Sequence, residues 1–249
     1  MKNTLDRVIE VLEHSNHMVF FGGAGVSTES GIPDFRGVDG LYHQQFKYEP
    51  ETILSHHFFM KNKEEFFQFY WNKMICVEAK PNITHKKLAQ LEKTGRLMAI
   101  ITQNIDGLHQ MAGSEHVEEL HGCVNRNYCT SCGKPYSLEE LLKRKEASET
   151  IYVPYCDCGG VIKPDVVLYE EGLNQEVVEQ TIQYLSKADT LIIGGTSLSV
   201  YPAAGFIRYF SGKELILINK TKTPCDNQTD LVINCGLGEV FSKVMVDNL

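Results

Sequence analysis

The sequence has no surplus of basic residues. Its 249 residues include 24 Lys and Arg against 32 Asp and Glu, which gives a formal net charge of −8. Domains that bind nucleic acid are usually basic, so we expect no nucleic-acid partner. With 43% hydrophobic and 22% charged residues, the chain is an ordinary globular protein, long enough for one large domain with an appendage or for two small domains.

The pattern of the sequence also predicts neither a secretory leader nor a membrane-spanning run. Near the N-terminus, Leu5, Val8, Ile9 and Leu12 follow the spacing of an amphipathic helix, with charged residues between them, which is not the pattern of a signal peptide. No apolar run approaches the roughly 20 residues that cross a bilayer. We therefore expect a cytoplasmic protein with no membrane partner.

Disulfides are not expected either, because a reducing compartment keeps thiols free. Of the eight cysteines, four lie in two close pairs, Cys129-x-x-Cys132 and Cys156-x-Cys158, each with glycine beside it. Four thiolates satisfy tetrahedral zinc, and glycine lets both sulfurs of a pair turn inward. The spacing predicts one closed, structural zinc site. The alternative is two pairs that are redox-active or merely buried.

Short apolar runs alternate with helical patterns along most of the chain. The runs cover residues 18–21, 98–101, 191–193, 215–218 and 231–233, and the clearest helical patterns cover 85–94, 174–187 and 238–247. Continuous apolar strands that alternate with helices indicate a parallel sheet covered on both faces. The predicted fold class is therefore α/β, a Rossmann-like doubly wound sheet.

Two regions do not follow this alternation. Residues 36–80 are rich in aromatic side chains, and residues 123–162 carry the paired cysteines and little apolar sequence. We expect both to form a smaller module, part helical and part zinc-binding, that is inserted twice into the larger domain. The larger domain would then comprise residues 1–35, 81–122 and 163–249.

A glycine-rich loop, GGAGVSTESGIPDFRG, follows the first strand at residues 22–37. Glycines at the carboxyl end of a strand let backbone N–H groups approach phosphate oxygens. The match to the dinucleotide fingerprint is partial, because Thr28 stands in place of the third glycine, and a tight turn is the alternative. Later in the loop, Arg36 could pair with a phosphate, or it could form a surface pair with Asp34.

Polar residues also follow the second strand, and a single histidine precedes the cysteines. Residues 98–101 lead directly into Gln103, Asn104 and Asp106, at an edge where ligands bind in doubly wound sheets. Local turn caps are the alternative. His121 lies near the junction of the two modules, where clefts occur, although a structural histidine would fit the same position.

Taken in order, these motifs resemble those of the sirtuins, NAD-dependent protein-lysine deacylases, and most closely the bacterial ones. The matching stretches are Gly23-Ala24-Gly25-x-Ser27, Pro33-Asp34-Phe35-Arg36-Gly37, residues 102–106, His121-Gly122, the four cysteines, Gly195-Thr196-Ser197-Leu198 and Asn219. The resemblance spans about residues 8 to 245. The ordered set is far more specific than any one motif.

The resemblance implies that NAD binds as a co-substrate and that the zinc is structural. Phe35 would lie near nicotinamide and Arg36 near phosphate, while Asp106 would accept a hydrogen bond from the nicotinamide carboxamide. The residues that it assigns to NAD are Gly23, Ala24, Gly25, Thr28, Asp34, Phe35, Arg36, Gln103, Asn104, Ile105, Asp106, His121, Gly195, Thr196, Ser197, Asn219 and Leu237.

The resemblance also implies a reaction, with His121 and Asn104 as catalytic residues. Nicotinamide would leave the ribose, the acyl-lysine oxygen would attack the same carbon, and His121 would act as general base on a ribose hydroxyl. The products would be free lysine, nicotinamide and O-acyl-ADP-ribose. The substrate peptide would add as a strand beside Val167, Tyr169 and Val200, and we expect the enzyme to be a monomer.

Two departures from the family pattern bear on the substrate. Glu170 stands where the family often has glycine, and with Glu171 it predicts negative charge near the peptide cleft and a mild preference for basic flanking residues. Sirtuins that remove succinyl groups carry a Tyr-x-x-Arg pair, whereas this chain has Phe67 and Tyr70. An apolar pocket does not stabilise a buried carboxylate, so we expect neutral acyl groups to be preferred.

Two other functions use the same motifs. An NAD-dependent mono-ADP-ribosyltransferase or NAD glycohydrolase begins with the same cleavage of nicotinamide and then uses another acceptor. A non-catalytic NAD-sensing module would use the zinc part for protein contacts. His121 and the pair Asn104 and Asp106 weigh against the sensor, because a protein that only binds NAD needs no base.

Overall fold

The computed structural model describes residues 4–34, 46–148 and 152–246. Its largest element is a parallel sheet of six strands in the order β3-β2-β1-β7-β8-β9. These strands are β1 (Met18–Gly22), β2 (Leu97–Thr102), β3 (Val117–Glu119), β7 (Thr190–Gly194), β8 (Glu214–Ile218) and β9 (Leu231–Ile233).

The strand order contains one topological switch point. From β1 the chain moves outward through β2 to β3, and it then returns to the other side of β1 as β7. The loops that leave β1 and β7 therefore diverge at the carboxyl edge of the sheet, which is where ligands bind in open α/β folds. The fold places the glycine loop of residues 22–34 at this point.

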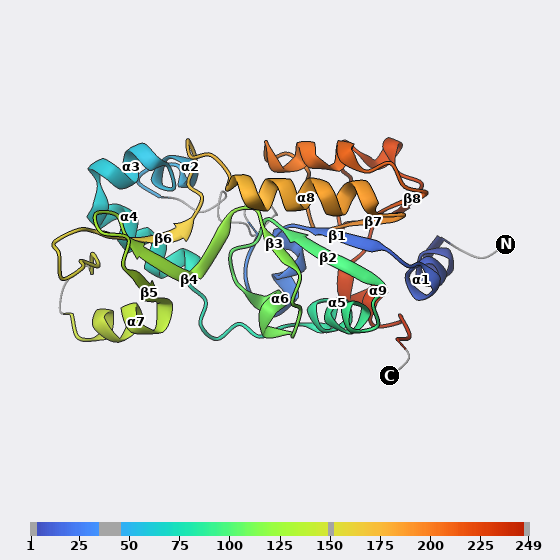
Figure 1. Cartoon of the computed structure of the whole chain (residues 1–249), viewed down its shortest axis with the longest axis horizontal. Helices are drawn as coiled ribbons and strands as arrows, with labels where there is room; N and C mark the ends of the chain where they lie inside the picture. Colours follow the sequence, from blue (N-terminus) through green and yellow to red (C-terminus); the bar gives the residue numbers. More distant parts are fainter. Residues whose placement is uncertain (1–3, 35–45, 149–151, 247–249) are drawn as a thin grey trace.

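Helices cover both faces of the sheet (Figure 1). Alternate residues of each strand supply the two cores, so that Phe20 packs on one face and Phe21 on the other. Helices α1 (Thr4–His14), α5 (Ile83–Lys93) and α9 (Leu237–Phe241) cover the Phe20 face. Helix α8 (Gln175–Lys187) and the 3₁₀ segment η5 (Ala203–Tyr209) cover the Phe21 face.

A second, smaller sheet lies at the other end of the molecule (Figure 1). Its antiparallel strands are ordered β5-β4-β6. Around it lie short helical segments with many aromatic residues, whose side chains pack with this sheet in one buried cluster. The elements are β4 (Gly122–Cys129), β5 (Pro135–Ser137), β6 (Ile162–Val166), α2 (Pro50–Ile53), α3 (His56–Lys61), α4 (Lys63–Phe69), η4 (Tyr70–Met74) and α7 (Leu138–Glu146).

The predicted α/β fold is confirmed, with two errors in its elements. The last helix ends at Phe241 and does not reach residue 247 as expected, because residues 242–246 continue as a turn and irregular chain. The edge strand β3 (Val117–Glu119) is absent from the predicted strands, because two of its three residues are glutamates and it forms no apolar run. The proposed boundaries of the larger domain and the inserted module stay a prediction.

Among the described residues, no helix combines the length and the apolar composition that crossing a membrane requires.

Candidate functional site

Two glycine loops meet at the switch point. The backbone N–H of Gly25 donates to the carbonyl of Gly195 at 2.8 Å, and the N–H of Gly23 donates to Gly194 at 3.2 Å. A Cβ atom on Gly25 would lie 2.7 Å from the Cα of Gly195, a distance at which side chains clash. Gly195 also has a φ of +59°, which favours glycine. The glycines therefore allow the β1 and β7 loops to touch.

Three polar side chains form a network beside these loops. The hydroxyl of Ser27 donates to Oδ2 of Asp106 at 2.6 Å, and Nδ2 of Asn104 donates to the same hydroxyl at 3.0 Å. Ser27 is only 1% exposed, so a buried hydroxyl connects the side chains of Asn104 and Asp106. Ser27 belongs to the motif Gly23-Ala24-Gly25-x-Ser27, but it is not among the residues predicted for the site, and that motif is the one signal in the sequence that points to it.

Asp106 uses its two oxygens differently. Oδ1 accepts a local hydrogen bond from the backbone N–H of Leu108 at 2.9 Å, while Oδ2 accepts the bond from Ser27. Oδ1 of Asp106 therefore forms a local turn cap, which was the alternative expected for these polar residues. The other oxygen is held by a residue 79 positions earlier in the chain, which local capping does not require.

Gln103 connects the strand end to two further predicted residues. Its side-chain amide donates to the hydroxyl of Thr196 at 3.1 Å. Its backbone carbonyl lies 3.0 Å from Nδ1 of His121. Because a carbonyl only accepts hydrogen bonds, Nδ1 of His121 must carry the proton, and Nε2 is left as the basic nitrogen.

The environment of His121 keeps its ring neutral. Burial lowers the pKa of His121 below its ordinary value, and the hydrogen bond to the Gln103 carbonyl opposes that shift. The ring nevertheless remains partly exposed. A neutral imidazole with one fixed proton and one free lone pair is suited to act as a general base.

The remaining residues predicted to bind NAD lie around the same edge or outside the described part. Asn219 follows β8 and donates to the Thr221 carbonyl at 2.8 Å, and Leu237 begins α9 after β9 and is buried. The other partly or fully accessible members in the described residues are Ala24, Thr28, Asp34, Ile105 and Ser197. Phe35 and Arg36 lie outside the described residues.

The predicted peptide-binding segment follows β6. The backbone N–H of Val167 donates to the carbonyl of His121 at 2.9 Å, so this segment lies directly beside the catalytic candidate. Tyr169 pairs through both backbone groups, donating to Leu54 at 3.0 Å and accepting from His56 at 2.9 Å. Val200, in the chain after β7, is partly buried.

The two glutamates after this segment have partners within the protein. Glu170 has a φ of +77°, and its carboxylate accepts a hydrogen bond from the backbone N–H of His57 at 3.0 Å. Glu171 pairs with Lys163 at 3.0 Å and with His56 at 2.8 Å. Lys163 therefore offsets part of the negative charge that the sequence suggested for the peptide cleft.

Phe67 and Tyr70, the residues predicted to favour neutral acyl groups, belong to the aromatic cluster. Phe67 is 0% and Tyr70 is 1% exposed, and their rings pack edge to face with centroids 6.2 Å apart. The hydroxyl of Tyr70 has no hydrogen-bond partner among the described residues. Both side chains are thus core residues, and neither brings a positive charge.

The four paired cysteines converge on one point. Their Sγ atoms all lie within 4.8 Å of one another, and the closest cross-pair distances are 3.4 Å for Cys129 to Cys158 and 3.7 Å for Cys132 to Cys156. Disulfide sulfurs are about 2.05 Å apart, whereas tetrahedral zinc with bonds of about 2.3 Å separates its sulfurs by about 3.8 Å. The geometry fits a zinc site.

Glycine makes this convergence possible. A Cβ atom on Gly160 would lie 2.6 Å from Sγ of Cys129, so a larger residue would push the ligand away. The hydroxyl of Tyr136 donates to Sγ of Cys156 at 3.1 Å, and the backbone N–H of Ser131 donates to Sγ of Cys129 at 3.4 Å. Donors of this kind stabilise thiolates.

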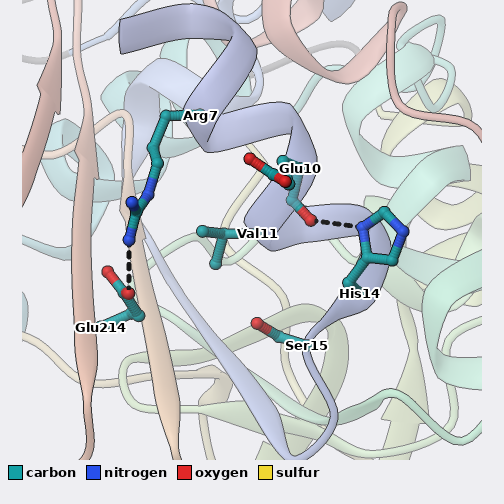
Figure 2. A pocket seen from close by; sticks show the side chains of 6 residues that line it. All are labelled: Arg7, Glu10, Val11, His14, Ser15 and Glu214. Carbon is teal, nitrogen blue, oxygen red and sulfur yellow. Dashed lines mark hydrogen bonds and ion pairs between the residues drawn. The ribbon is translucent and has the colours of Figure 1, made fainter. Parts of the chain in front are cut away.

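A separate hollow of about 350 Å³ lies where α1 meets the start of β8 (Figure 2). It is at the amino edge of the strands, away from the switch point. Its charged side chains pair locally: Arg7 lies 3.1 Å from Glu214, and His14 contacts the backbone carbonyl of Glu10 at 2.8 Å. We assign no part of the candidate site to it.

Comparison of sequences identifies one family and several close relatives. Residues 23–202 match the Sir2 family. A protein of Clostridium acetobutylicum named NAD-dependent protein deacetylase is 56% identical over 247 residues, covering 97% of this chain and 99% of the relative. A protein of Clostridium perfringens with the same name is 54% identical, covering 98% of this chain and all of the relative.

Solved structures with the same fold contain peptides. A Sir2 protein with a deacetylated p53 peptide and 3′-O-acetyl ADP ribose superimposes with a TM-score of 0.89 at 40% identity, covering 98% of each chain. A Sir2 protein bound to a propionylated peptide gives a TM-score of 0.85 at 39% identity, again covering 98% of each chain.

Proposed function

This chain belongs to the Sir2 family, and we propose that it is an NAD-dependent protein-lysine deacetylase that releases nicotinamide and O-acyl-ADP-ribose. The observation that carries the proposal is the meeting of His121 with the Asn104, Ser27 and Asp106 network at the switch point. The relatives named NAD-dependent protein deacetylase match nearly the whole chain, which supports the same conclusion.

His121 is the proposed general base. Its Nδ1 proton is held by the Gln103 carbonyl, so Nε2 takes the proton from a ribose hydroxyl. Burial keeps the pKa of the ring below its ordinary value, so the imidazole is neutral at physiological pH. Positioned general bases contribute roughly 10²–10⁴-fold to a reaction rate.

Asn104 and Asp106 are proposed to orient the nicotinamide end of NAD. When bound, NAD supplies the ribose carbon that accepts the acyl oxygen and nicotinamide as the leaving group. Asn104 is anchored through its Nδ2 to Ser27, which leaves its carbonyl oxygen for a ribose hydroxyl or a water. Asp106, fixed by Ser27 and Leu108, can still accept a hydrogen bond from the carboxamide.

The phosphates and the adenosine are proposed to lie along the two glycine loops. Gly23, Gly25 and Gly195 bring backbone close together there, which suits phosphate oxygens. Arg36 would add a charge that pairs with phosphate, and Phe35 would cover nicotinamide. Further along the edge, Asn219 and Leu237 would contact the ribose and adenine.

The substrate is proposed to be an acyl-lysine in an extended peptide that lies as a strand beside Val167, Tyr169 and Val200. Main-chain pairing reads the backbone more than the side chains. The neighbouring Sir2 structures that contain peptides support this choice of substrate. Because Lys163 and His56 engage Glu171, we expect the preference for basic flanking residues to be weak.

We propose that neutral acyl groups are preferred over succinyl. Phe67 and Tyr70 offer no positive charge, and burial raises the pKa of Tyr70 above its ordinary value, so neither side chain would stabilise a carboxylate. The ratio of kcat/KM for acetyl-lysine and succinyl-lysine versions of one peptide measures this preference. Equal values for the two peptides would contradict it.

The four cysteines would hold one zinc ion that supports structure and takes no part in the reaction. All four positions of a tetrahedral site are filled by sulfur, so none remains for substrate. We further propose that the enzyme acts as a monomer in the cytoplasm without binding nucleic acid. The net charge of −8 and a set of thiols suited to a reducing compartment support these expectations.

One assay tests the proposed function. The protein is incubated with NAD and an acetyl-lysine peptide, and the expected products, nicotinamide and O-acetyl-ADP-ribose, are followed by mass spectrometry. His121→Ala should reduce turnover at least about 10²-fold. His14→Ala, a control at the amino edge of the sheet, should not. ADP-ribosylated peptide without O-acetyl-ADP-ribose would instead favour the transferase.

A further inference from the structure

An ion pair between a buried lysine and a partly exposed glutamate lies beside the proposed peptide-binding segment. Lys163, on β6, is only 5% exposed. Its ammonium group donates to the carboxylate of Glu171 at 3.0 Å and to the backbone carbonyl of Val166 at 2.8 Å. A buried ammonium group is costly unless it is paired. The proposed reaction gives this ion pair no role, so its function has to be sought in the structure around it.

The pair holds the backbone on both sides of Val167. Lys163 binds the carbonyl that precedes Val167, and Glu171 accepts a hydrogen bond from the N–H of Leu168, which follows it, at 2.9 Å. The N–H of Val167 itself donates to the carbonyl of His121. Lys163 and Glu171 therefore fix the two peptide groups that flank Val167, the residue beside His121.

The same carboxylate also connects this segment to helix α3. The second oxygen of Glu171 lies 2.8 Å from Nδ1 of His56, the first residue of α3. The backbone N–H of His56 donates to the carbonyl of Tyr169 at 2.9 Å. A displacement of the segment would thus break contacts to β6 and to α3 together.

We propose that Glu171, held by Lys163 and His56, is a positioning residue that sets the affinity for the acyl-lysine peptide by fixing the backbone of residues 166–169. This inference rests on the proposed function, because that function places the peptide beside Val167 and Tyr169. The residues act through the backbone and do not touch the reacting atoms. Their loss should therefore raise KM for the peptide while kcat and KM for NAD change little.

The test compares Glu171→Gln and Lys163→Met with a matched exposed pair. Lys143 and Glu139 form an ion pair of 2.7 Å on α7, with both side chains more than 70% exposed, so Glu139→Gln and Lys143→Met make the same chemical changes away from the segment. Glu171→Gln and Lys163→Met should each raise the peptide KM about fivefold or more, with kcat and the NAD KM within about twofold. Each exposed variant should leave all three unchanged.

A double variant separates positioning from loss of folding. If Lys163 and Glu171 act as one unit, Glu171→Gln combined with Lys163→Met should raise the peptide KM no more than the worse single variant. His56→Ala, which changes a half-exposed partner, keeps the inference testable if the Glu171 and Lys163 variants do not fold, and it should raise the peptide KM about twofold.

Two results would overturn the inference. A peptide KM within twofold of wild type in Glu171→Gln and Lys163→Met, or an unchanged peptide KM in His56→Ala where those two do not fold, would show that the cluster does not position the peptide. Parallel loss of kcat, NAD binding and thermal stability would show a general structural role. Absence of deacetylation by the wild-type protein would overturn the proposed function and, with it, this inference.

Discussion

The two sheets of this molecule are stabilised in different ways. The six-stranded sheet buries continuous apolar strands on both faces under five helical segments, so its stability is distributed over many side chains. The three-stranded sheet lies beside an aromatic cluster, but its exposed end is joined through four sulfur atoms. One set of four metal ligands can therefore decide whether the smaller sheet folds, whereas no single residue decides the folding of the larger sheet.

Loss of the metal ligands should have the largest effect. In structural zinc sites the apparent binding free energy is about 10–16 kcal/mol, so Cys129→Ser should abolish zinc binding and unfold the three-stranded sheet. Zinc content by atomic absorption and thermal unfolding by circular dichroism measure both results. Cys76→Ser, at an exposed cysteine outside the cluster, is the control. Full zinc content and unchanged unfolding in Cys129→Ser would contradict the assignment.

A cavity in the large sheet should destabilise the protein less than the loss of a zinc ligand does, and it should leave the zinc bound. Ile192 in β7 is 0% exposed, and Ile→Ala changes in a core lower the free energy of unfolding by about 2–5 kcal/mol. Denaturant unfolding of Ile192→Ala measures the loss, and the zinc content should stay at one ion per chain. If Ile192→Ala lost zinc as well as unfolding free energy, the stability of the two sheets would not be independent.

Acid should destabilise the large sheet region through two buried histidines. Burial lowers the pKa of His85 to about 4 and lowers that of His109 well below its ordinary value. Between pH 6.5 and about 4 the unfolded chain therefore binds more protons than the folded one, and the free energy of unfolding falls as the pH falls.

The expected slope is about 1.4 kcal/mol per pH unit for each such histidine. Urea unfolding at a series of pH values measures it, and His109→Leu, which removes one titrating ring whose two nitrogens lack partners among the described residues, should have a shallower slope. An identical pH profile in the variant would show that His109 does not contribute.

A change at the active-site candidate should affect stability least. Asp106→Asn keeps the size of the side chain but weakens a hydrogen bond to Ser27, which costs about 1 kcal/mol of unfolding free energy. Its main effect should be on nicotinamide, with weaker inhibition and slower exchange of labelled nicotinamide into NAD. Unchanged inhibition would mean that Asp106 acts only as a local cap, as its bond to Leu108 would allow.

The sequence predicts the large sheet well because its signals are local. Apolar runs of three or four residues and the residues that follow them locate the ends of β1, β2, β7, β8 and β9 to within one residue. The short edge strand β3 gives no such signal, because its pairing with β2 is set by tertiary contacts and not by its own residues.

The sequence predicts which residues belong to the site, but it does not predict the hydrogen bonds and ion pairs between them. The resemblance supplied Asn104, Asp106 and His121, yet the contact between Ser27 and Asp106 joins residues 79 positions apart. The sequence also suggested free negative charge at Glu171, whereas folding brings Lys163 against it. A charge pattern along the chain does not show which partners the fold will bring together.

The contact between Gly25 and Gly195 limits which substitutions this protein can accumulate during evolution. Neither position tolerates a side chain while the other loop stays where it is. A substitution in either loop would therefore require a simultaneous backbone shift in a segment 170 residues away in the chain. Libraries that vary one loop at a time should return glycine at both positions, and changes of co-substrate will more easily begin at neighbouring residues whose Cβ atoms already face open space.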